Sequence, residues 1–96
     1  MTFEFFTTVS VTSNAHKVQT NSAAVFLVGA VTIGTIATAA AGGFSADGTT
    51  IVGISSAGSV TGGLIGGKFV VTAISATQWA IRGFLIGSST IETPFV

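Results

Sequence analysis

The amino-acid sequence predicts an all-β protein, a small antiparallel sandwich or barrel of about six to eight short strands with an extended C-terminal arm. Three observations predict this class. Apolar and polar residues alternate along several short segments, glycine-rich turns separate these segments, and β-branched side chains fill them. The 96 residues leave room for one domain, 1–96, with one core.

The first predicted strand covers residues 3–13. Phe3 and Phe5 fall on one face of it together with every second residue that follows. Turn-prone and polar residues then predict loops at 13–17 and at 21–22.

The middle of the chain predicts two more strands and a pronounced break. Alternation resumes at Ala23 and is interrupted by glycines, which favours two strands over one long strand. The glycine-rich stretch 41–48 is the clearest predicted break, because it ends in an Asp-Gly pair typical of tight turns. A further strand is predicted over 49–54.

The last third of the chain predicts the strongest strands. A turn at 55–58 and a weak, glycine-spaced piece at 60–65 precede strands over 68–75 and 77–87. In the last strand one face carries Trp79, Ile81, Gly83 and Leu85, and the other carries Gln78, Ala80, Arg82 and Phe84. Residues 88–96 include the single proline, Pro94, whose nitrogen cannot donate a ladder hydrogen bond. This tail is therefore predicted to leave the sheet as an extended arm.

Charge is scarce along the whole chain. The six formally charged residues are Glu4, Lys17, Asp47, Lys68, Arg82 and Glu92, whereas soluble domains devote about 25% of their residues to charge. Mixed charge normally keeps soluble surfaces apart, so we expect much of this surface to be covered by other subunits. The net charge of zero gives no electrostatic footprint for nucleic acid, and the absence of cysteine excludes disulfides.

A membrane-spanning helix is the main alternative to a strand in the uncharged region Ala23–Gly43. The length suits a single span of about 20 residues. The residue types suit it less well, because many are β-branched and glycines interrupt the run.

Residues 62–68 resemble a phosphate-binding loop but do not complete it. They satisfy the first seven positions of the G-x-x-x-x-G-K pattern, and Phe69 then stands where Ser or Thr would bind magnesium. The glycines are better explained by a hairpin or by a close approach of two subunits, with Lys68 as the solvated flank.

Other chemistry-bearing residues do not form a recognisable catalytic pattern. His16 is the single histidine and is interpreted as a loop residue, because a base or metal ligand needs partners around it. Asp47 is interpreted as a turn residue, and the remaining carboxylates, Glu4 and Glu92, lie near the two ends. We therefore expect no enzyme activity, no catalytic or metal site, no cofactor and no small-molecule substrate.

Aromatic residues on alternating strand positions are typical of cores and subunit interfaces. Arg82 is expected either in solvent or at a subunit contact, with Glu92 or a neighbour's Glu4 as its partner. The candidate core or interface residues are Phe3, Phe5, Trp79, Ile81, Arg82, Leu85, Pro94 and Phe95.

The C-terminal stretch from Thr77 to Phe95 resembles the ending of short β-rich virion proteins of tailed bacteriophages. The shared features are the Trp strand Thr77-Gln78-Trp79-Ala80-Ile81-Arg82-Gly83, the small-residue turn Ile86-Gly87-Ser88-Ser89-Thr90 and the terminal Thr93-Pro94-Phe95. The resemblance covers about the last 20 residues. It implies a decoration, cement, knob or fibre-associated protein on the virion surface, with a trimer favoured and a major capsid or tail protein as partner.

A pilus-like or amyloid-like fibre subunit is a further alternative. Low charge and high strand content fit it equally well, but it would grow into open filaments instead of closed rings.

Overall fold

The computed structural model describes residues 1–10, 15–20, 22–36, 41–56, 58, 60–88 and 91–96. Two sheets form from the strands β1 (Thr2–Phe6), β2 (His16–Gln19), β3 (Phe26–Thr35), β4 (Ala41–Asp47), β5 (Gly53–Ser56), β6 (Lys68–Ala73) and β7 (Gln78–Gly87). The described residues contain no helix. The predicted all-β class is confirmed.

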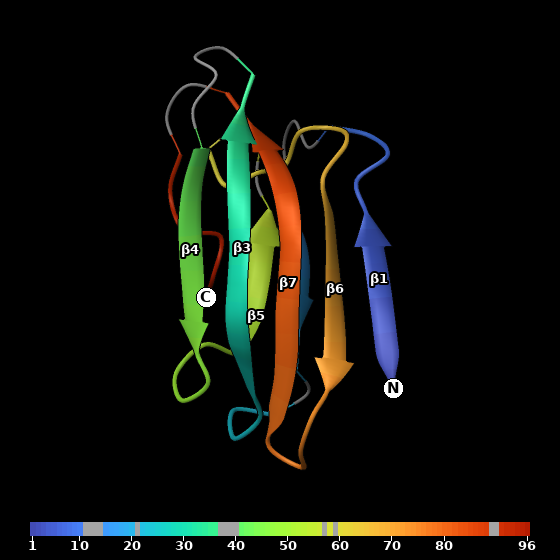
Figure 1. Cartoon of the computed structure of the whole chain (residues 1–96), viewed down its shortest axis with the longest axis vertical. Coiled ribbons are helices and arrows are strands. Elements are labelled where there is room, and N and C mark those ends of the chain that lie inside the picture. Colours follow the sequence, from blue (N-terminus) through green and yellow to red (C-terminus); the bar gives the residue numbers. More distant parts are fainter. Residues whose placement is uncertain (11–14, 21, 37–40, 57, 59, 89–90) are drawn as a thin grey trace.

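The larger sheet has five strands in the order β1-β6-β7-β3-β4, and the smaller sheet pairs β2 with β5. In Figure 1 the larger sheet faces the viewer and the smaller sheet lies behind it. Neighbouring strands are antiparallel except β3 and β7, which run parallel from the Phe26–Gln78 pair to the Thr35–Gly87 pair. The fold is therefore a small sandwich with unequal layers.

The core lies between the two sheets. On β3 and β7 the buried residues fall on alternate positions, as the alternation in the sequence predicts, although Gly29 in this series is exposed and Trp79 and Gly83 are half-buried. Ile33 and Leu85 are fully buried. The buried apolar side chains are Leu27, Val31, Ile33, Ala46, Ile54, Phe69, Val71, Ile81, Leu85 and Phe95.

Backbone contact between β6 and β7 depends on a glycine. Gly83 pairs with Phe69, and a Cβ built on Gly83 would overlap the Lys68 carbonyl oxygen and lie 2.5 Å from Phe69 Cα. The missing side chain therefore leaves the space that the Phe69 backbone and side chain occupy.

The C-terminal tail pairs with β5 on the side away from β2 and so extends the smaller sheet by a third, strand-like segment. The Ser55 N–H donates to the Pro94 carbonyl at 2.7 Å, and the Val96 N–H donates to the Gly53 carbonyl at 3.0 Å. Pro94 and Phe95 are buried there. The tail is extended as expected and leaves the larger sheet after Gly87, but it packs along β5 instead of projecting from the molecule.

Several expectations about strand boundaries are wrong. The strand predicted over 3–13 ends at Phe6, one strand, β3, stands where two were favoured, and the strand predicted over 49–54 begins only at Gly53 and extends into the predicted turn as far as Ser56.

Residues 41–47, predicted as part of a break, form β4, because an edge strand with one neighbour tolerates Gly42 and Gly43, which have no side chain to pack. His16 and Lys17, predicted in a loop, open β2. The predicted turn itself is present after Asp47.

The region Ala23–Gly43 does not form the alternative helix. Its described residues contribute β3 and the start of β4. No helix among the described residues is long and apolar enough to cross a membrane.

Candidate functional site

An apolar opening lies between β1 and β2, and we call it the seam. The two sheets separate here. The smaller sheet lies behind β3 and β7 and does not reach behind β1 (Figure 1). The seam encloses about 270 Å³ and is lined by Phe3, Phe5, Val18, Gln19, Thr20, Leu27, Ile54, Val71 and Trp79.

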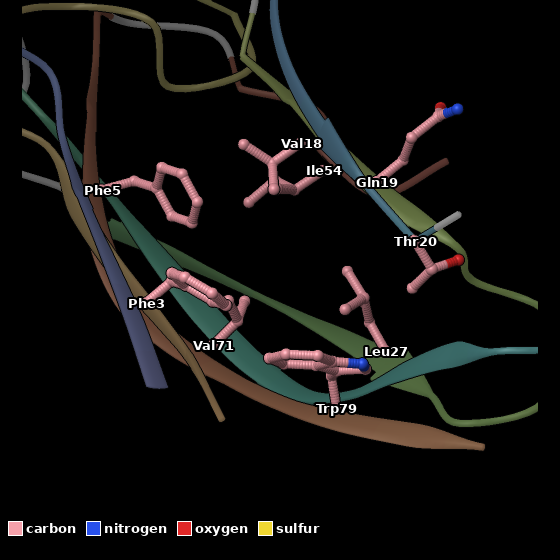
Figure 2. A pocket seen from close by; sticks show the side chains of 9 residues that line it. All are labelled: Phe3, Phe5, Val18, Gln19, Thr20, Leu27, Ile54, Val71 and Trp79. Atoms are coloured by element: carbon pink, nitrogen blue, oxygen red, sulfur yellow. The ribbon is translucent and has the colours of Figure 1, made fainter. Parts of the chain in front are cut away.

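Side chains from both sheets point into the seam. Figure 2 shows the Phe5 ring directed towards Val18 on β2, while the Phe3 ring, also from β1, lies beside Val71 on the side of Trp79 and Leu27. The Phe3 ring stacks on Trp79 with 6.0 Å between centroids, and it remains 46% exposed. An aromatic side chain this exposed leaves apolar surface in contact with water, which is costly unless something covers it.

A second, smaller hollow continues the seam along β2. It encloses about 190 Å³ and shares Phe5 and Val18 with the first. Its other lining residues are Phe6, Thr7, His16, Ser56 and Phe69. The first hollow is lined mainly by apolar side chains, with Gln19 and Thr20 as its polar residues, whereas two hydroxyls and an imidazole border the second.

Both strands that flank the seam have a free backbone edge within the described residues. β1 pairs with β6 alone, and β2 pairs with β5 alone. The Thr20 N–H donates to the Val52 carbonyl, so the backbone N–H and C=O groups of the even-numbered residues of β2 face β5. By the alternation of an antiparallel ladder, the N–H and C=O groups of Lys17 and Gln19 face the open edge.

The opposite side of the larger sheet, which we call the outer face, has a different character. It carries the residues that alternate with the core positions, including Thr2, Glu4, Phe6, Val28, Ala30, Thr32, Gly43, Ser45, Asp47, Lys68, Val70, Thr72, Ala80, Arg82 and Phe84. Four of the six charged residues lie on it, and the Lys68 ammonium pairs with the Glu4 carboxylate at 3.4 Å. The seam lining carries no formal charge.

The structure separates the eight sequence-predicted site residues into three groups. Phe3, Phe5 and Trp79 meet at the seam. Arg82 is exposed on the outer face and forms no ion pair within the described residues, so neither Glu92 nor the chain's own Glu4 is its partner. The buried group is Ile81, Leu85, Pro94 and Phe95.

Asp47 closes the turn after β4. Its carboxylate accepts hydrogen bonds from the Thr50 hydroxyl at 2.6 Å and from the backbone N–H groups of Thr49 and Thr50 at 2.9 and 2.8 Å. These bonds, the Thr50 hydroxyl first, hold the pKa of Asp47 well below its usual range. The carboxylate acts as a turn residue, as predicted.

The glycine-rich residues 62–68 do not build a phosphate cradle. They form turns that lead directly into β6, and no helix follows. Gly62 adopts a φ of 80°, and a Cβ there would lie 2.6 Å from Leu85 Cβ. The glycine thus permits a close approach to the core within the chain, and the close approach of two subunits stays a prediction.

Sequence reasoning missed β2 and therefore missed Val18, Gln19 and Thr20 as part of the site. The single signal was the apolar Val18 between polar neighbours, which is too short a pattern to predict a strand. Titratable groups do not converge in the seam, and within the described residues no three His, Asp or Glu side chains gather as metal ligands. What the seam offers is apolar surface beside unpaired backbone.

Comparisons with protein-family models, with curated protein sequences and with solved structures find no match to this chain.

Proposed function

We propose that this chain is a structural subunit of a bacteriophage particle. In this proposal it self-associates, with a trimer as the favoured form, and decorates or cements a capsid or tail lattice at the virion surface. The observation that carries the proposal is the seam, where exposed aromatic surface lies beside unpaired strand edges and no charge is available to solvate it.

The rest of the surface supports a binding role in the same way. Large apolar side chains that are more than half exposed include Phe6 on β1, Ile36 after β3 and Ile65 in the turn before β6. Apolar surface of this kind, with little charge to keep molecules apart, favours association. The resemblance of the C-terminal stretch to phage virion proteins supports a virus particle as the setting of this association.

Dilution tests the self-association. Sedimentation velocity of the purified chain from micromolar to nanomolar concentration should show an oligomer that dissociates on dilution, because association stabilises by mass action. A folded monomer at every concentration would contradict self-association. Filaments without a defined end in electron micrographs would favour the fibre alternative.

Particle composition tests the lattice role. Purified phage particles from cells that encode the chain should contain it in a fixed ratio to the capsid or tail protein, measured by quantitative mass spectrometry. Particles that lack the chain would contradict the virion assignment, whatever the oligomeric state.

A further inference from the structure

We propose that the seam is a strand-addition site. An extended segment of the lattice protein pairs with the free edge of β2 and places two apolar side chains, two residues apart, in the two hollows. The inference rests on the proposed structural role and names the contact through which the subunit binds its lattice.

The smaller sheet is too narrow to cover the larger one. It consists of β2, β5 and the C-terminal tail, and it leaves the inner side of β1 open at Phe3 and Phe5. One more strand beside β2 would cover these rings. Within the described residues the N–H and C=O groups of Lys17 and Gln19 have no partner, and the added strand would satisfy them. Backbone pairing of this kind supplies much of the affinity in strand addition.

The arrangement of the two hollows matches the geometry of one strand. They share Phe5 and Val18, and one extends towards Thr20 while the other extends towards His16. They therefore lie in series along β2. Side chains on one face of a strand are about 6.6 to 6.8 Å apart, so consecutive inward side chains enter consecutive hollows.

The lining defines which side chains fit. The larger hollow, about 270 Å³, is bounded mainly by aromatic and aliphatic residues, with Gln19 and Thr20 as its polar residues, and accepts a bulky apolar or aromatic side chain. The smaller, about 190 Å³, is bordered by His16 and by Ser56 and accepts a smaller apolar side chain such as Val.

Charge complementarity defines the residue between them. Lys17 lies between the two inward residues of β2 and is exposed. A partner residue opposite Lys17 in an antiparallel pair points to the same outward side, where a carboxylate would pair with the ammonium. The expected segment therefore reads apolar-acidic-apolar and runs antiparallel to β2.

Binding of one such segment is weak by itself. A strand of five or six residues spans about 17 to 20 Å and buries less surface than the roughly 1,200 Å² of the smallest stable interfaces. Many copies on one lattice raise the overall affinity by avidity. A repeating surface is thus the setting in which such a site is effective.

A designed peptide provides the test on the intact chain. The probe is acetyl-Ser-Thr-Phe-Glu-Val-Thr-Ser-amide, in which Glu pairs with Lys17, Phe enters the larger hollow and Val enters the smaller. Trp79 is the single tryptophan and lines the seam, so its fluorescence reports occupancy. We expect saturable binding with a blue shift of the Trp79 emission.

Two control peptides separate strand addition from general stickiness. Exchange of Glu and Phe in the probe keeps its composition and breaks the spacing of the apolar residues. N-methylation of Glu removes the N–H that pairs with the Lys17 carbonyl. Both controls should bind at least about thirtyfold more weakly, the loss expected for a central anchor. Equal binding of all three peptides would overturn the proposal.

Two phenylalanine variants localise the site. Phe3→Ala removes a wall of the seam, whereas Phe84→Ala removes a ring on the outer face that is 50% exposed and lines neither hollow. Phe3→Ala should weaken probe binding about tenfold or more, and Phe84→Ala should change it less than about threefold. A larger loss for Phe84→Ala would overturn the assignment to the seam.

Amide hydrogen exchange identifies the paired edge. With the probe bound, the amides of Lys17 and Gln19 should become protected, while those of Thr2 and Glu4 on the free edge of β1 should not. Protection of β1 alone, or crosslinks that place a second copy of the chain in the seam, would overturn the proposal. None of these outcomes depends on whether the chain is found in phage particles, so the two proposals fail separately.

Discussion

The outer face of the larger sheet and the seam are built from the same short alternating strands but differ in how they meet water. The outer face carries Glu4, Asp47, Lys68 and Arg82 among small and hydroxyl-bearing side chains. The seam exposes Phe3 and Trp79 without any charge. The few charges of this chain are therefore concentrated on one face, and the uncharged opening on the other side is where a partner is expected.

The sharpest test of this contrast compares neighbours on β3. Ile33 is fully buried, whereas Thr32 lies on the outer face. Ile33→Ala should lower the free energy of unfolding by about 2 to 5 kcal/mol, because it leaves a cavity in the core. Thr32→Ala should lower it by less than about 1 kcal/mol. Urea unfolding measures both, and equal losses would show that the two faces are not distinct.

Two glycines offer the reverse test, in which a methyl group is added. Gly83→Ala should destabilise by about 1 to 3 kcal/mol, because the new Cβ would overlap the backbone of β6. Gly43→Ala should stay within about 0.5 kcal/mol of wild type, since a Cβ there meets nothing within 4 Å. Thermal unfolding of the pair decides, and a neutral Gly83→Ala would refute the close approach of β6 and β7.

Acid should lower the free energy of unfolding through Asp47, the outer-face residue that caps the turn after β4. Because the pKa of Asp47 is lower in the folded chain, its stabilisation is complete above the ordinary value of 3.8 and is lost as the pH falls below it. Asp47→Asn should therefore be less stable than wild type at neutral pH and should lose less stability on acidification. If the free energy of unfolding fell equally with pH in both proteins between neutral pH and pH about 2, this role of Asp47 would be contradicted.

The smallest effect is expected for the ion pair on the outer face. Lys68 and Glu4 are 47% and 59% exposed, so solvent screens their attraction. Glu4→Gln should cost no more than about 0.5 kcal/mol, and the loss should vanish at high salt. Glu92→Gln, at an exposed carboxylate without an ion pair in the described chain, is the matched control. A loss above that of a core substitution would reverse the contrast between the faces.

The long strands were predictable from sequence because their alternation is extended enough to define a face. Trp79, Ile81 and Leu85 share the inner face of β7 as predicted, and Arg82 lies on the other side. When one face of a sheet is buried, every second residue of a strand must be apolar, so the pattern can be recognised from the local sequence alone. The all-β class followed from the same property.

The short elements could not be predicted because their structure depends on distant partners. β2 forms because β5 supplies its hydrogen bonds, and β4 tolerates two glycines because β3 holds it in register. The burial of Phe95 likewise depends on pairing with Ile54, 41 residues earlier in the chain. The seam lies between two such elements, so sequence indicated its aromatic wall at Phe3 and Phe5 but not the wall at Val18.

The parallel pairing of β3 with β7 has a consequence for how fast the molecule forms. These strands meet at the middle of the sheet, yet residues 36–77, a stretch of 42, separate them. That closure must be completed before the central contacts are gained, which raises the entropic barrier. We expect slow folding, with β3 left unpaired on its β7 side until the chain end joins it. During that interval an excess of identical chains is a hazard, since unpaired strand edges invite aggregation.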